Sequence, residues 1–213
     1  MKIYTFGHGA QSFEAFLEKI NQAKIDIIVD IREKPFSRYY LYFNRNFLEK
    51  KLGKKYMFAG NFLGGSAEFH NNLLEYIKNH GKNLENSRNK LFVIIDENTR
   101  QKIFSQEPQF SNDEKRKIWI TENFLKYYIP QNKREQAIRF LKEKIFTEEN
   151  KDKTVCFLCS EKEHRFCHRY YLLEKDWLKE FPQIKQIFHL EEDFDKKDKL
   201  DDEKSLEQEK LFK

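Results

Sequence analysis

One short stretch concentrates the reactive side chains of this chain and constrains the structure around them. Residues 154–158 (Thr-Val-Cys-Phe-Leu) form an apolar run with the length of a buried strand. The reactive side chains follow it within eleven residues: Cys159, Glu161, Cys167, His168 and Arg169. After Arg169 the apolar side chains recur at helical spacing. We therefore predict a strand, a loop and a helix, and α/β proteins commonly place their chemistry in such loops.

Apolar runs and helical periodicities alternate along the rest of the chain. The runs predict strands at residues 2–6, 25–31, 91–96, 153–158 and 184–190. Helical spacing predicts a helix that follows an N-cap at Ser12, a helix around residues 47–52 and a helix over residues 133–146. This alternation predicts an α/β fold, a layered and mostly parallel sheet flanked by helices.

The 213 residues divide into a folded body and two polar segments. Residues 1–190 are predicted to form a single α/β domain, with residues 79–122 as a polar, variable insertion. Residues 191–213 form a charged tail with ten acidic and six basic side chains. Because the whole chain carries a formal net charge of +5, the first 190 residues carry +9. A basic body suits an anionic partner, although a lysine-rich proteome produces the same excess.

The chain has the features expected of a cytoplasmic protein. No stretch approaches the ~18–20 apolar residues of a membrane span. The first residues also lack the apolar segment and cleavage site of a signal peptide. We therefore expect a cytoplasmic location and no membrane partner. Thiols stay reduced there, so the three cysteines are expected to be free, catalytic or metal-bound rather than joined in disulfides.

The carboxyl ends of parallel strands meet at one edge of a sheet, where ligand sites form. This edge is predicted to gather the following side chains: His8, Asp30, Arg32, Ser37 and Cys159, with His189 near them. Arg32 either binds a carboxylate or phosphate of the substrate or pairs locally with Asp30. Gly64 and Gly65 predict a turn at which the backbone closely approaches a neighbour.

Cys159 and Cys167 are the candidate nucleophile or redox thiols. Nearby cations favour a thiolate, and the loop supplies four candidates: His164, Arg165, His168 and Arg169. Glu161 is the candidate general acid or base, or else an ion-pair partner of Arg169. The alternative is a buried cysteine that closes a strand before a structural loop. Cys156 is expected in the core, because strand positions three apart face opposite ways.

A zinc site is a second interpretation of the same loop. Its ligands would be Cys159, Cys167 and His168, with His164 or His189 as a fourth. The spacing differs from that of structural zinc knuckles, whose ligand pairs lie ~2–4 residues apart. Adjacent Cys167 and His168 are also expected to diverge if they are helical. The thiol interpretation is therefore preferred, no metal ligand is assigned, and the cofactor stays unknown.

Aromatic and basic side chains alternate after the second predicted strand. Five rings lie close to Arg38 and Arg45: Phe36, Tyr39, Tyr40, Tyr42 and Phe43. Rings of this kind stack nucleic-acid bases, and the cations hold phosphates. The alternative is an aromatic loop that packs on its own domain.

Several ordered blocks resemble the domain-of-unknown-function 488 family, an uncharacterised family with a Cys-x-Glu…Cys-His-Arg signature. The blocks span residues 3 to about 190: Gly7-His8, Asp30-Ile31-Arg32 with Pro35 and Ser37, Leu63-Gly64-Gly65, and Cys159-x-Glu161 followed by Cys167-His168-Arg169. The chain departs from the family in having Gly9-Ala10, where members often carry serine after Gly-His. The resemblance implies a soluble α/β protein of bacteria or archaea whose signature residues gather in one pocket. It also implies a link to nucleic-acid or nucleotide metabolism.

These features favour an enzyme that acts on a small anionic or nucleotide-like substrate. Its catalytic residues would be Cys159, Glu161, Cys167 and His168. Its substrate-binding residues would be His8, Asp30, Arg32, Ser37, Gly64, Gly65 and Arg169. Two alternatives stay open: a nucleic-acid-binding module with a structural cysteine loop, and a zinc-stabilised interaction domain. The sequence sets no oligomeric state.

Overall fold

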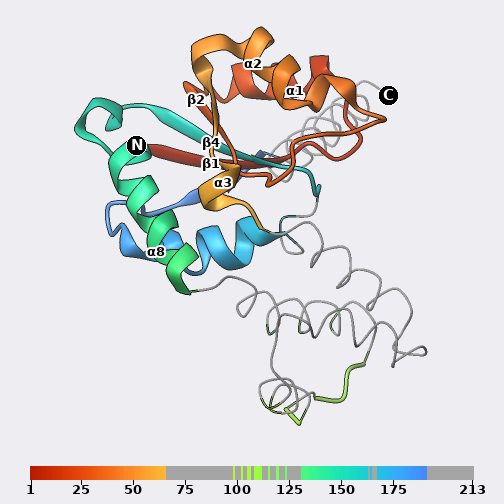
Figure 1. The fold of residues 1–213 in the computed structure, drawn as a ribbon, viewed down its shortest axis with the longest axis vertical. Coiled ribbons are helices and arrows are strands. Elements are labelled where there is room, and N and C mark those ends of the chain that lie inside the picture. Colours follow the sequence, from red (N-terminus) through yellow and green to blue (C-terminus); the bar gives the residue numbers. More distant parts are fainter. Residues whose placement is uncertain are drawn as a thin grey trace, which may run out of the picture.

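Five strands form one parallel sheet at the centre of the molecule (Figure 1). The computed structural model describes residues 1–65, 131–162, 164 and 167–190, with single positions between 98 and 123. The strands are β1 (Lys2–Gly7), β2 (Ile27–Asp30), β3 (Tyr56–Phe58), β4 (Thr154–Cys159) and β5 (Ile187–His189). They lie in the order β3-β2-β4-β1-β5, and every pairing is parallel. The predicted α/β fold is confirmed.

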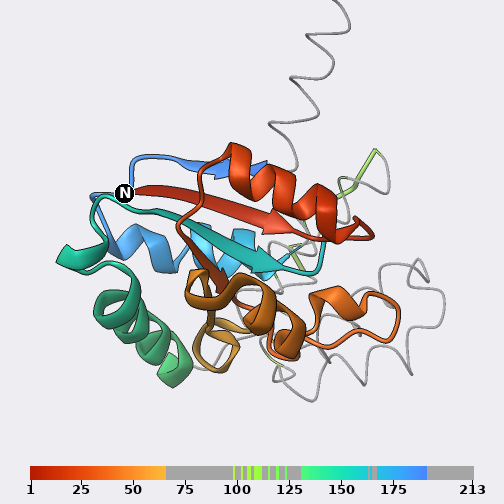
Figure 2. The ribbon, with the colours of Figure 1, turned by 90° about the horizontal axis from the view of Figure 1, so that it is seen from above.

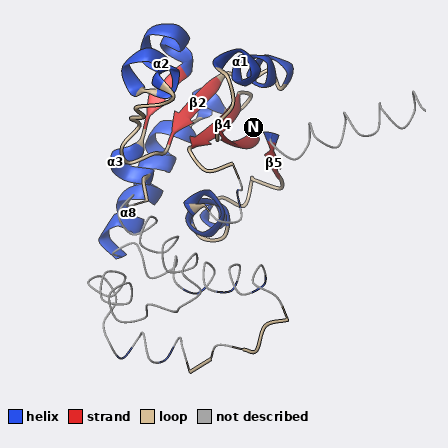
Figure 3. Ribbon diagram, turned by 90° about the vertical axis from the view of Figure 1, so that its right-hand side faces the viewer, coloured by secondary structure: helices blue, strands red, loops and turns tan. Residues whose placement is uncertain are grey.

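Helices cover both faces of the sheet (Figures 2 and 3). One face carries α1 (Phe13–Gln22) and α2 (Arg45–Leu52). The other carries α3 (Gly60–Leu63), α8 (Gln131–Phe140), the π-helical turns η4 (Leu141–Ile145) and η7 (Arg169–Glu174), and the 3-10 helix η8 (Trp177–Glu180). Three short 3-10 turns complete the described elements: η1 (Leu41–Phe43), η2 (Gly53–Lys55) and η5 (Glu148–Asn150).

The two faces of β4 separate the cysteines. Cys156 and Leu158 pack into the core under α1 and α2, whereas Val155, Phe157 and Cys159 pack into the core under α3 and α8. Successive strand residues face opposite ways, so both faces of β4 must be apolar, as the continuous apolar run predicts. Cys156 therefore lies in the core, as predicted, and points away from Cys159.

The observed element boundaries show which local sequence signals were sufficient to predict a helix or a strand. Ser12 caps α1, since its Oγ accepts a hydrogen bond from the backbone N–H of Ala15 at 3.2 Å. The helix predicted over residues 133–146 begins at Gln131 and continues after Phe140 as a π-helical turn. The strand β3 was not predicted, because three residues are too few to show a period.

Some predictions lie outside the described residues. These are the strand at 91–96, the tail at 191–213 and most of the insertion at 79–122. Among the described residues, no helix is both long enough and apolar enough to cross a membrane.

β1 and β4 are parallel neighbours in the sheet, but the connections that follow them run toward opposite edges of it. From β1 the chain passes through α1 to β2 and β3, and from β4 it passes through η7 and η8 to β5 on the opposite side. The register pairs Gly7 with Cys159 and Asp30 with Leu158, so three strands end at the same level. Ligand sites in open α/β sheets form at such a switch point, beyond the carboxyl ends.

Gly7 sets how closely the end of β1 approaches the loop after β4. A Cβ atom at this position would collide with the backbone oxygen of Glu161 and would lie 2.5 Å from Nη2 of Arg169. We expect Gly7→Ala to lower the free energy of unfolding by about 3 kcal/mol, the upper part of the range for overpacking. Urea denaturation followed by circular dichroism measures this change. Ala10→Ser, at an exposed position, should change it by less than about 0.5 kcal/mol; equal effects of the two substitutions would contradict the close approach.

Candidate functional site

Four side chains converge where β4 ends. They are Cys159 at the strand end, Glu161 in the loop, and Cys167 and His168 just before η7. Their four potential ligand atoms all lie within 4.8 Å of one another. The Sγ atoms of Cys159 and Cys167 are 3.2 Å apart, and Oε2 of Glu161 lies 2.8 Å from the first and 3.4 Å from the second. We call these four residues the thiol cluster.

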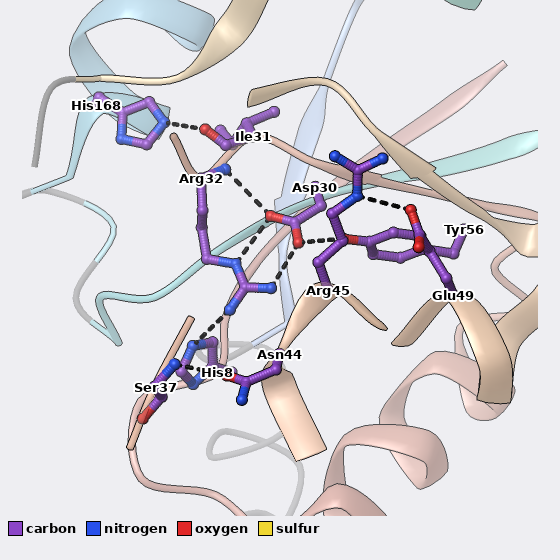
Figure 4. Close-up of polar contacts among 10 residues, drawn as sticks. All are labelled: His8, Asp30, Ile31, Arg32, Ser37, Asn44, Arg45, Glu49, Tyr56 and His168. Carbon is purple, nitrogen blue, oxygen red and sulfur yellow. Dashed lines mark hydrogen bonds and ion pairs between the residues drawn. The ribbon is translucent and has the colours of Figure 1, made fainter. Parts of the chain in front are cut away.

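The imidazole of His168 is oriented by the end of β2. Its Nε2 lies 3.2 Å from the backbone oxygen of Ile31 (Figure 4). Since a carbonyl oxygen only accepts, Nε2 carries a proton, and Nδ1 faces the cluster. Nδ1 lies 3.7 Å from both Sγ atoms. Gly65 packs against this ring, because a Cβ added there would lie 3.1 Å from Cγ of His168.

Arg169 is buried behind the cluster and holds the loop in place. Its backbone N and its Nε each lie 3.4 Å from Sγ of Cys167. Its Nη2 donates to the backbone oxygens of Glu161 and Lys162. A guanidinium in this position fixes the loop and supplies positive charge to a thiolate at Cys167.

The surroundings push the two thiol pKa values apart. Burial raises the pKa of Cys159 well above its ordinary value, and the neighbouring Cys167 raises it further. Burial also opposes ionisation of Cys167, but the hydrogen bond from Cys159 and the charges of His168 and Arg169 hold its pKa well below the ordinary value. Burial lowers the pKa of His168, yet the Cys167 thiolate raises it overall. Of the two thiols, Cys167 is therefore the one whose surroundings favour the thiolate.

The donor set suits a soft divalent metal. Zinc binds thiolate sulfur at about 2.3 Å and imidazole nitrogen at about 2.0–2.1 Å, so tetrahedral ligand atoms lie about 3.3–3.8 Å apart. The separations in the thiol cluster bracket that range. Adjacent Cys167 and His168 were expected to diverge if they were helical, and this condition is not met. Cys167 precedes the helix, at a bend, so both side chains face Cys159.

Beside the cluster, a second network links the end of β2 to the first residue of β3 (Figure 4). Both oxygens of buried Asp30 accept from Arg32, with Nε at 2.8 Å from Oδ1, and Tyr56 of β3 donates its hydroxyl to Oδ2 at 2.6 Å. Burial opposes the charge on Arg32, but Asp30 outweighs it and raises the pKa of Arg32. Sequence reasoning missed Tyr56, since its strand carried no signal. The local Asp30–Arg32 pair is the alternative that the structure shows.

His8 is the third member of this network. Its Nδ1 lies 2.8 Å from the backbone oxygen of Gly9, and Nη1 of Arg32 lies 3.3 Å from its Nε2. Nδ1 therefore donates and Nε2 accepts, which requires a neutral ring. Burial and the charge of Arg32 lower the pKa of His8 to about 4. The ring also stacks on Phe43 at 4.1 Å between centroids.

The remaining predicted site residues have structural contacts. Oγ of Ser37 accepts from the backbone N–H groups of Tyr39 and Tyr40. Gly64 packs on the backbone of Glu33, where a Cβ would lie 2.9 Å from Cα. His189 bonds Oγ1 of Thr5 at 2.8 Å and stacks on His164, so neither histidine joins the thiol cluster. The substrate-binding roles of His8, Asp30, Arg32, Ser37, Gly64, Gly65 and Arg169 stay predictions.

Two of the surface hollows in the described part of the chain include no predicted site residue. One, of about 430 Å³, lies between residues 174 and 187, and the other, of about 480 Å³, lies along α8. Cys159 and Cys167 are buried, whereas Glu161 and His168 are partly exposed. A ligand therefore reaches the thiol cluster past Glu161 and His168.

His8 makes stability depend on pH. Its folded-state pKa of about 4 lies below the ordinary 6.5, so between these values the unfolded chain binds a proton that the folded chain does not. The free energy of unfolding should then fall as the pH drops through this window, by at most about 3 kcal/mol. Urea denaturation at pH 7 and pH 4.5 tests this. His8→Gln should show a smaller drop than the natural sequence, and an equal drop would contradict the assignment.

Comparisons with known proteins identify part of the chain. Residues 12–89 match the family model described as "Domain of unknown function DUF488". No curated protein matches the chain. No solved structure matches it either. The matched residues include Asp30, Arg32, Ser37, Gly64 and Gly65, whereas the thiol cluster lies beyond them. Residues 12–89 are therefore similar to the DUF488 domain, a domain of unknown function, and the chain carries a Cys/Glu/His cluster at the edge of its sheet.

Proposed function

We propose that this protein is an enzyme whose active centre is a zinc-type divalent metal ion, bound by the thiol cluster, and which acts on a small anionic or nucleotide-like group of its substrate. The observation that carries the proposal is the convergence of two sulfurs, one imidazole nitrogen and one carboxylate oxygen within 4.8 Å. Thiolate and imidazole together select zinc over magnesium or calcium. The hydrogen bond from His168 to Ile31 supports it, because metal-binding histidines almost always donate their other ring N–H in this way.

The position of the cluster supports a catalytic rather than a structural metal. It lies at the switch point of the sheet, where α/β proteins bind ligands. Cys159, Cys167 and His168 provide the three ligands of a catalytic zinc site, which keeps its fourth position for water or substrate. Glu161 would be the fourth ligand of the resting site and, once a substrate group replaced it, would be placed to serve as the general acid or base. A metal in such a site activates water near neutral pH or polarises a substrate oxygen.

The charges around the cluster favour an anionic substrate. With both thiols and Glu161 ionised, the protein ligands carry three negative charges. A divalent ion and buried Arg169 balance them. An anionic substrate group that replaces the Glu161 carboxylate would keep this balance if Glu161 then took up a proton, as a general acid does. The site therefore suits an anionic group at its fourth position.

A metal-free thiol enzyme is the second candidate. The favouring observation is the lowered pKa of Cys167, which makes it a thiolate beside a protonated Cys159. With the two Sγ atoms 3.2 Å apart, the pair is placed for thiol–disulfide chemistry. Cys167 would then be the attacking thiol and Cys159 the resolving one.

Metal content separates the two candidates. Freshly purified full-length protein should carry about one zinc-type ion per chain, measured by native mass spectrometry and elemental analysis. After chelation, Co²⁺ should restore occupancy and produce the absorption bands of thiolate-bound cobalt. Cys159→Ser, Cys167→Ser and His168→Gln should each lower occupancy at least tenfold.

Cys156→Ala is the matched control, because this cysteine lies on the other face of β4. It should keep the metal and the cobalt bands. Protein that binds no metal, and whose Cys159 and Cys167 are recovered as a disulfide, would overturn the metal proposal in favour of the thiol enzyme. Loss of metal in the Cys156→Ala variant would show that the assigned ligands are wrong.

A further inference from the structure

We infer that residues 34–55 form a binding surface for single-stranded nucleic acid. The surface consists of the loop after β2, the turn η1, the helix α2 and the turn η2. The inference deepens the proposed function, because it names the class of substrate that is brought to the thiol cluster. It rests on the proposed function for what happens to the bound strand. Binding itself is argued from the surface alone.

Large apolar side chains are exposed at one place on this surface. Phe36 is 70 % exposed, Tyr39 89 % and Leu41 60 %, and among the described residues only Phe62, at 40 %, is another large hydrophobic side chain so exposed. Single exposed residues are common, but three within six positions indicate a contact surface. Phe36 and Tyr39 present open ring faces, on which bases stack irrespective of sequence.

The segment that carries these rings is also rich in basic side chains. Residues 34–55 contain seven basic side chains and one acidic one, a formal net charge of +6. All seven are exposed: Lys34, Arg38, Arg45, Lys50, Lys51, Lys54 and Lys55. Glu49, the acidic one, pairs with Arg45 at 2.7 Å. This surface therefore complements a polyanion along its length, and a strand that combines phosphates with bases fits both the charges and the rings.

Hydrogen bonds hold the loop in a fixed shape. Oγ of Ser37 accepts from the backbone N–H groups of Tyr39 and Tyr40, and Oδ1 of Asn44 accepts from the backbone N–H of Ser37. The hydroxyl of Tyr42 donates to the backbone oxygen of Gln11 at 3.2 Å. A loop fixed in advance loses little conformational freedom on binding, so its exposed rings are suited to a ligand rather than to collapse onto the domain.

The surface begins beside the thiol cluster. The loop continues directly from Ile31, whose backbone oxygen faces His168, and from Arg32, whose guanidinium contacts His8 (Figure 4). Phe43 of the same loop stacks on His8. A strand lying across Phe36 and Tyr39 therefore has a phosphate or sugar within reach of the partly exposed Glu161 and His168.

Fluorescence anisotropy with the full-length protein tests the inference. The probes are fluorescein-labelled oligo-dT and oligo-U of twelve nucleotides and a blunt duplex of the same length, each titrated at several salt concentrations. Phe36→Ala and Tyr39→Ala should each weaken single-strand binding about fivefold or more, with little change in duplex binding. Lys34→Ala/Arg38→Ala should weaken binding and reduce the slope of log K against log salt by about 1.4.

Lys142→Ala/Lys144→Ala, at two exposed positions of η4, is the matched charge control and should leave the affinity unchanged. Absent binding, or ring variants that bind the single strand as tightly as the natural sequence, would overturn the inference. Chelated protein should bind the strand as tightly as metal-loaded protein. A protein that takes up no metal but binds the strand would thus refute the proposed metal centre alone. A protein that takes up metal but binds no strand would refute this inference alone.

Discussion

The parallel pairing of β1 with β4 is the constraint on which the rest of the structure depends. Strands distant in sequence become neighbours, and their register places Gly7 opposite Cys159. Because Gly7 has no side chain, Arg169 and the loop at Glu161 can lie against the end of β1. The thiol cluster and the His8 network then share one edge, although more than 100 residues separate their sequences.

The sequence predicted the elements that repeat a pattern and missed those that depend on tertiary contact. The run at 154–158, the N-cap at Ser12 and the helix starting near residue 133 are local signals, and the structure contains all three elements. Tyr56 carries no such signal, since its contact with Asp30 exists only after β3 pairs with β2. The geometry of Cys167 and His168 was left conditional on whether both are helical, because it depends on where η7 begins and helix ends are poorly set by sequence.

The thiol cluster supports two chemistries that exclude each other. A disulfide between Cys159 and Cys167 removes two of the four candidate ligands, and a bound metal occupies both sulfurs. Arg169 and His168 favour the free thiolate of Cys167, from which either chemistry starts. Local electrostatics therefore explain why a thiolate forms, and the metal available to the protein determines which chemistry follows.

The sheet also ends in two short strands. β3 and β5 contain three residues each and form its two edges in the described part of the chain. An outer strand of this length exposes few unpaired amide and carbonyl groups, so it offers a poor template on which another polypeptide could extend the ladder. The protein can thus keep exposed rings on a basic surface without also inviting aggregation through the margins of its sheet.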